Sequence, residues 1–207
     1  IGLVNVVGSA IARESDYVIY TLAGPEIAVA TTKAYSAQLV AMYSFALALA
    51  KAKKRVDEKK EKEIIYELES LPSKIERLLD EKERIQWFAS KFSSAKDVFF
   101  IGRGIDWAIS MEGSLKLKEI RYIHSEAYAA GELKHGTISL LENGTLVVGI
   151  LTDDALIEKT VSNLTECRTR GAYIMALTTY GHYSTEDSSD FTVYIPRTLK
   201  YFTPSLA

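Results

Sequence analysis

The sequence predicts an α/β fold in which a doubly wound, mostly parallel sheet is flanked by helices. From residue 96 onward, short apolar runs rich in β-branched residues alternate with longer segments whose apolar residues recur at helical spacing. The expected strands are 97–101, 126–130, 145–151, 173–178 and 191–195. The expected helices between them are 106–123 and 154–170, and Asp153 or Asp154 is the expected cap of the second. Such alternation is typical of parallel sheets joined by crossover helices.

The front of the chain carries a shorter version of the same pattern. Strands are expected at 1–7 and 17–22, followed by a helix over 31–54 that Thr31 or Thr32 could cap. Between the two α/β parts, residues 56–92 are dense in Lys and Glu and have apolar residues at helical spacing. We expect a solvated linker of three helices, with a break before Pro72, which would open the second of them. A partner-binding surface is the alternative interpretation.

Composition excludes several classes of protein. Among 207 residues, 25 are basic and 27 acidic, so the basic excess of a nucleic-acid binder is missing. The longest apolar run, 39–50, is shorter than the roughly 20 residues that span a bilayer, so no membrane association is expected. A single cysteine, Cys167, allows no intrachain disulfide, which indicates a reducing, cytoplasmic setting.

Three charged residues of the helix 106–123 share one stripe. At 100° per residue, Glu112, Lys116 and Glu119 fall within about 60° of each other. Apolar residues flank this stripe, with the core face expected at Ile109, Gly113, Leu117 and Ile120 and the solvent face at Ser114, Lys118 and Arg121. Partial burial favours a neutral carboxyl group and a nearby ammonium favours a charged one, a balance that suits a general base. A purely structural ion pair remains the alternative.

His135 is the second candidate. It lies between Gly131 and Gly136, which would let a ligand approach the backbone, and an imidazole titrates near neutral pH. A histidine that stabilises a turn is the alternative. No metal-ligand spacing is present, so no metal site is expected.

Two long runs carry a resemblance to a known family. Residues 112–120 (EGSLKLKEI) with 122–136 (YIHSEAYAAGELKHG), and upstream residues 13–16 (RESD) with 23–34 (AGPEIAVATTKA), resemble the isomerase half of glucosamine-6-phosphate synthases. The resemblance implies two sugar-isomerase (SIS) domains. Residues 1–55 would be the C-terminal part of the first, 56–92 a helical linker, and 93–207 the second without its last helix and tail.

The resemblance also implies residue roles in making glucosamine 6-phosphate from fructose 6-phosphate and ammonia, a reaction for which it implies neither a metal nor an organic cofactor. Glu119 would shuttle a proton between C1 and C2, and Lys116 would assist proton movement or polarise an oxygen. His135 would open the sugar ring and be donated by the other subunit of a homodimer. Val29 and Thr31 would contact the sugar, Thr31 standing where the family has serine.

The resemblance places other parts of the enzyme outside this chain. The phosphate-binding loops would precede Ile1, the lysine that forms a Schiff base would follow Ala207, and a glutaminase domain would belong to the parent protein. We therefore expect a fragment that is inactive by itself. A related double-SIS sugar-phosphate deaminase or deglycase, or a non-catalytic phosphosugar-binding SIS module, is the alternative.

Overall fold

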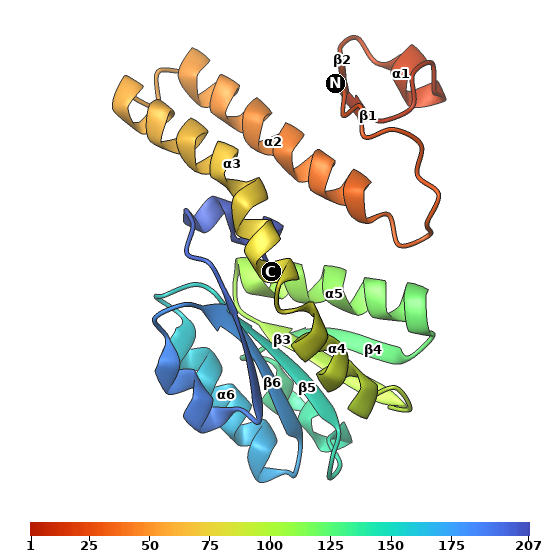
Figure 1. The fold of residues 1–207 in the computed structure, drawn as a ribbon, viewed down its shortest axis with the longest axis vertical. Coiled ribbons are helices and arrows are strands. Elements are labelled where there is room, and N and C mark those ends of the chain that lie inside the picture. Colours follow the sequence, from red (N-terminus) through yellow and green to blue (C-terminus); the bar gives the residue numbers. More distant parts are fainter. The chain divides into compact units, whose positions relative to one another are not determined.

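The first part of the chain is a small α/β unit. The computed structural model describes all of residues 1–207, which form two compact units, 1–70 and 71–207. In the first unit, β1 (Gly2–Val4) pairs in parallel with β2 (Val18–Tyr20), and α1 (Ala10–Glu14) connects them. The helix α2 (Thr32–Ala52) follows (Figure 1). Both predicted strands are confirmed, but each is only three residues long.

The predicted cap of α2 is wrong. Thr31 precedes the helix with a left-handed backbone (φ 55°), and its side chain makes no capping hydrogen bond. Its hydroxyl donates instead to the carbonyl oxygen of Val29 at 2.8 Å. The side chain therefore stabilises the turn before the helix and leaves the first-turn N–H groups uncapped.

The predicted helix break before Pro72 is also wrong. α3 is one helix, Glu58–Leu79, with Pro72 in its interior, and α4 (Lys82–Lys91) follows. Proline removes one N–H donor from the helical ladder, which disfavours this position. The apolar positions nevertheless keep their helical spacing through it, and the adjacent Leu71 is only 3% exposed. None of the helices in the chain combines the length and the apolar character needed to cross a bilayer.

A five-stranded parallel sheet forms the second unit, as predicted. Its strand order is β4-β3-β5-β6-β7, and every neighbouring pair is parallel. The strands are β3 (Asp97–Gly102), β4 (His124–Ala129), β5 (Leu146–Leu151), β6 (Tyr173–Thr179) and β7 (Phe191–Ile195). After β3 the chain adds β4 on one side of it, and then crosses to the other side of β3 to add β5, β6 and β7 in turn. The direction in which strands are added therefore reverses between β3 and β5. This is a doubly wound sheet.

Helices cover both faces of this sheet, which is why β5 is buried along its whole length. Phe99, Ile101 and Val147 point into a core that includes Leu164 of α6 (Ile157–Thr169). The alternate residues point the other way and pack with α4 and with α5 (Ile105–Arg121); they include Val98, Phe100, Leu146 and Val148. Because successive side chains of a strand point to opposite faces of the sheet, the two cores lie on opposite faces.

Two details of α6 depend on its surroundings. The predicted cap at Asp153 or Asp154 is wrong, because the helix begins only at Ile157 and Asp153 accepts a bond from Ala155 N (3.2 Å) in the preceding turn. Gly149 of β5 lets the helix approach the sheet closely. A Cβ atom there would lie 2.7 Å from a methyl carbon of Leu164.

Candidate functional site

The predicted stripe on α5 forms an ion-pair cluster centred on Lys116. Its ammonium donates to Glu119 Oε2 at 2.7 Å and lies 3.5 Å from Glu112 Oε1. The helix produces this contact because residues three and four apart are neighbours on its surface. The side chains are 24% exposed for Lys116 and 29% for each glutamate, so the cluster is partly desolvated and still reachable from solvent.

Electrostatics keep Lys116 charged. The hydrogen bond with Glu119, and then the two carboxylate charges, raise the pKa of Lys116 against an opposing effect of burial. The ammonium uses Oε2 of Glu119, which leaves Oε1 for a proton or a substrate. The pair can therefore act as a carboxylate base beside a fixed cation, an arrangement that can move a proton and stabilise negative charge on an oxygen.

The face of α5 that packs on the sheet differs from the prediction. Ile109 is buried as expected, but Ser114, expected in solvent, is 2% exposed, and Ile120, expected in the core, is 53% exposed. The Ser114 hydroxyl lies 2.9 Å from that of Ser125 on β4, which also donates to the Ser114 carbonyl oxygen at 2.8 Å. Paired hydroxyls on small side chains let the helix approach β4 closely without an unsatisfied polar group.

His135 lies in a short 3₁₀ turn, Leu133–His135, after β4. The turn is anchored by Leu133, which is 1% exposed, and by a bond from His135 N to Glu132 O (3.0 Å). The imidazole itself is exposed and has no hydrogen-bond partner in the chain, so the alternative of a turn-stabilising side chain is not favoured. Gly136 follows with φ 153°, a conformation that favours glycine.

A single chain does not bring His135 and Glu119 together. α5 starts after β3 at the carboxyl edge of the sheet and ends before β4 at the amino edge, so Glu119 lies about 20 Å along the helix from its start. His135 follows the carboxyl end of β4. The 3₁₀ turns around it pack, through Leu133 and Ile138, into the core on the α6 face, opposite to α5. The elements that carry Glu119 and His135 therefore pack on opposite faces of one sheet.

Comparison with known proteins decides the family. A family model described as the SIS domain matches residues 1–48 and 91–205. The chain belongs to the SIS domain family. The SIS chain is 56% identical over 206 residues to a glutamine–fructose-6-phosphate aminotransferase (isomerizing) of Caldanaerobacter subterraneus subsp. tengcongensis, covering 100% of this chain and 34% of that protein.

Two further relatives agree. The aminotransferase of the same name from Clostridium tetani is 50% identical over 207 residues, again covering 100% of this chain and 34% of that protein. The solved C-terminal domain of glucosamine-fructose-6-phosphate aminotransferase from Francisella tularensis has a TM-score of 0.90 and 34% identity, covering 99% of this chain and 58% of that one. The SIS chain therefore spans about a third of the length of the curated relatives it matches.

Val29 and Thr31, the predicted sugar contacts of the SIS chain, lie in the first unit between β2 and α2. Val29 is 78% exposed and its carbonyl accepts the bond from the Thr31 hydroxyl. Thr31 is half-buried. Their part in the same site as Glu119 stays a prediction.

The Gly102-Arg103-Gly104 turn joins β3 to α5, and a buried carboxyl group follows it. Asp106, in the first turn of α5, is 1% exposed and accepts bonds from Thr152 N (2.9 Å), the Thr152 hydroxyl and Asp153 N (3.4 Å). Burial raises the pKa of Asp106 against the effect of these hydrogen bonds. The carboxyl group thus joins α5 to the loop after β5. Sequence reasoning missed this role, although a polar pair directly after an apolar strand was a visible signal.

The remaining two histidines lie beside carboxyl groups. His124 Nδ1 lies 2.7 Å from Asp97 Oδ1, and His182 Nε2 lies 2.8 Å from Asp154 Oδ1. The chain holds no group of three or more His, Cys, Asp or Glu side chains placed to bind a metal ion.

Proposed function

We propose that this chain is the sugar-isomerising part of a glutamine–fructose-6-phosphate aminotransferase, which converts fructose 6-phosphate and glutamine-derived ammonia to glucosamine 6-phosphate. The observation that carries the proposal is the 56% identity over the whole chain to an aminotransferase of that name. The Lys116–Glu119 pair supplies chemistry that such an isomerisation needs. Because the chain spans a third of its relatives, activity belongs to the longer protein, with a glutaminase domain as the ammonia source.

The proposed division of the chain follows the family match. Residues 1–55 would be the C-terminal part of a first SIS domain, 56–92 a helical linker and 93–207 a second SIS domain. The SIS family model leaves residues 49–90 unmatched between its two segments, which supports a linker there. A reducing cytoplasmic setting fits Cys167, which is fully buried and whose pKa burial raises to about 12.

In the proposed reaction, Glu119 moves one proton. His135 opens the sugar ring, and ammonia condenses with the C2 carbonyl of the open-chain ketose with loss of water. The Glu119 carboxylate removes a proton from C1, and the electron pair of that C–H bond forms a C1=C2 double bond. The electron pair of the C2=N double bond moves onto nitrogen, which takes up a proton and becomes the amine. Glu119 returns the proton to C2 while the C1 hydroxyl loses its proton, which leaves an aldehyde at C1 and an amine at C2. Lys116 stabilises negative charge on the oxygens meanwhile.

Removing the carboxylate tests this role. In the full-length parent, Glu119→Gln should reduce kcat by about 10²–10⁴-fold, the usual contribution of a positioned acid–base group, with sugar binding retained. Glu158→Gln, on the exposed surface of α6, makes the same chemical change and should leave kcat unaltered. Isomerisation at the normal rate in Glu119→Gln would refute the assignment.

We further propose a homodimer in which His135 of one subunit completes the site of the other. Its support is the separation of His135 and Glu119 onto opposite faces of one sheet. Mixing inactive Glu119→Gln and His135→Asn parents should restore about a quarter of the normal activity, because half of the random dimers are mixed and each has one intact site. No recovery on mixing, with dimers formed, would show that His135 acts within its own chain or not at all.

A further inference from the structure

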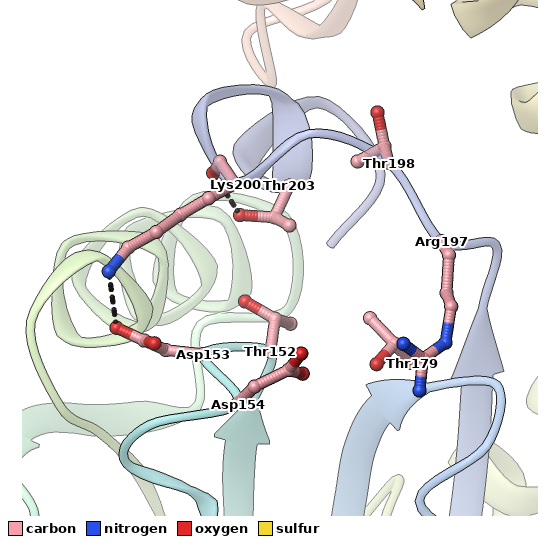
Figure 2. A pocket seen from close by; sticks show the side chains of 8 residues that line it. All are labelled: Thr152, Asp153, Asp154, Thr179, Arg197, Thr198, Lys200 and Thr203. Atoms are coloured by element: carbon pink, nitrogen blue, oxygen red, sulfur yellow. Dashed lines mark hydrogen bonds and ion pairs between the residues drawn. The ribbon is translucent and has the colours of Figure 1, made fainter.

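A cavity of about 190 Å³ opens at the carboxyl edge of the sheet in the second unit (Figure 2). Thr152 follows β5, Thr179 ends β6, and Arg197 and Lys200 lie in the segment after β7. In open α/β sheets, ligands bind outside the carboxyl ends of the strands. The volume equals about six water molecules at roughly 30 Å³ each, which suits a compact small molecule.

The cavity is separate from the proposed catalytic residues. Glu119 lies near the end of α5, at the amino edge of the sheet, whereas the cavity lies at the carboxyl edge. His135 follows β4, and the strands β3 and β5 stand between β4 and β6. A ligand in the cavity would therefore not touch Glu119 of the same chain.

Charge pairing within the cavity leaves one cation without a counter-ion. Asp153 is ion-paired with Lys200 (2.8 Å), and Asp154 Oδ1 lies 2.8 Å from His182 Nε2. The hydrogen bond to Asp153 raises the pKa of Lys200, so this ammonium stays charged at neutral pH. Arg197 uses only Nε, which donates to Tyr180 O at 2.7 Å, and no carboxylate pairs with it. Its two terminal nitrogens can still bind an anion in bidentate geometry.

Hydroxyl groups line the rest of the cavity. Four threonines contribute, Thr152, Thr179, Thr198 and Thr203. The Thr152 hydroxyl is bound to Asp106, and the Thr203 hydroxyl donates to Lys200 O at 3.0 Å. Thr179 is 5% exposed and lies in the wall of the cavity. A hydroxyl in the wall of a cavity can donate a hydrogen bond to a ligand there and accept one from it.

We propose that this cavity is a second sugar-phosphate site, with the phosphate bound by Arg197 and a sugar hydroxyl bound by Thr179. A phosphate matches the unpaired guanidinium, and a polyhydroxylated ring matches a wall of hydroxyls and carboxylates. The site goes beyond the proposed function, since it requires neither Glu119 nor His135. Binding there would let a sugar phosphate act on the second unit without entering the catalytic site.

The test is a titration of the 207-residue chain with glucose 6-phosphate, followed by backbone amide NMR shifts. Shifts should concentrate at Thr152, Thr179 and Thr198. Arg197→Gln should weaken binding about tenfold or more, as expected for loss of a charge-assisted hydrogen bond. Arg170→Gln is the matched control, because Arg170 is exposed at the end of α6, near the opposite edge of the sheet. This variant should bind glucose 6-phosphate as tightly as the unaltered chain does.

Further variants separate the possible outcomes. Thr179→Val, which keeps the side-chain shape, should weaken binding several-fold with a native spectrum. Glu119→Gln should bind unchanged, so a failed catalytic assignment leaves this result intact. The proposal is overturned if shifts fall outside the cavity, if Arg197→Gln binds normally, or if inorganic phosphate binds as tightly as the sugar phosphate.

Discussion

The buried carboxyl group of Asp106 should make the stability of the second unit depend on pH, and the substitution Asp106→Asn should remove this dependence. Burial raises the pKa of Asp106 above its usual 3.8, so folding favours the protonated form. This group therefore contributes stability that is fully present below pH 3.8 and is lost as pH rises through its folded-state pKa. Asp106→Asn cannot titrate and should gain stability relative to the unaltered chain as pH rises from about 4 to neutral.

The loss of stability expected when the Asp106 side chain is truncated to alanine follows from the three groups that donate hydrogen bonds to its carboxyl group. Asp106→Ala leaves Thr152 N, the Thr152 hydroxyl and Asp153 N without their acceptor. An unsatisfied buried donor costs about 1–3 kcal/mol, and removing a desolvated carboxyl group offsets part of the sum. We expect a net loss of about 2–4 kcal/mol for Asp106→Ala at neutral pH and a loss below about 1 kcal/mol for Asp106→Asn.

Tryptophan fluorescence can measure this unit alone. The only two tryptophans, Trp87 and Trp107, both lie in the second unit, so their emission during urea unfolding reports on residues 71–207. Free energies of unfolding would be compared for the three proteins between pH 4 and neutral pH. Equal losses in Asp106→Asn and Asp106→Ala, or parallel pH profiles for Asp106→Asn and the unaltered chain, would refute the reasoning.

Three other predictions concern the same unit. Leu164→Ala should lower the free energy of unfolding by about 2–5 kcal/mol in urea titrations, since Leu164 is fully buried beneath Gly149; a loss under 1 kcal/mol would contradict the packing. The Cys167 thiol, whose pKa is raised to about 12, should react with a thiol reagent only as the chain unfolds, and fast labelling of the folded chain would contradict its burial. Lys116→Met should change the free energy of unfolding by less than about 1 kcal/mol, because the pair is a quarter exposed, yet reduce kcat of the parent; a large loss of stability with normal kcat would make the pair structural.

Local periodicity was enough to predict the parallel sheet and the charged stripe. Apolar runs such as that of β5 indicated buried strands, and the three-and-four spacing placed Lys116 against both glutamates. The same periodicity did not identify the buried face of α5. Ser114 is buried because its hydroxyl pairs with Ser125 on a strand that a helical projection does not include.

Features made by distant segments could not be predicted from local patterns. The cavity joins a loop after β5, the end of β6 and the segment after β7, and none of these carries a recognisable motif. At Pro72, in contrast, a local pattern gave a wrong prediction. A local rule predicted a helix break, but the apolar side of α3 continues past it and buries Leu71, so packing overrides the proline.

The transfer of a proton by Glu119 is tested most directly with fructose 6-phosphate that carries deuterium at C1. The full-length parent should pass part of this deuterium to C2 of glucosamine 6-phosphate, since one carboxyl group removes and returns the hydrogen. In Glu119→Gln, turnover and label transfer should fall together by at least about 10²-fold while the product still binds. Label transfer at the normal rate in that variant would contradict the account.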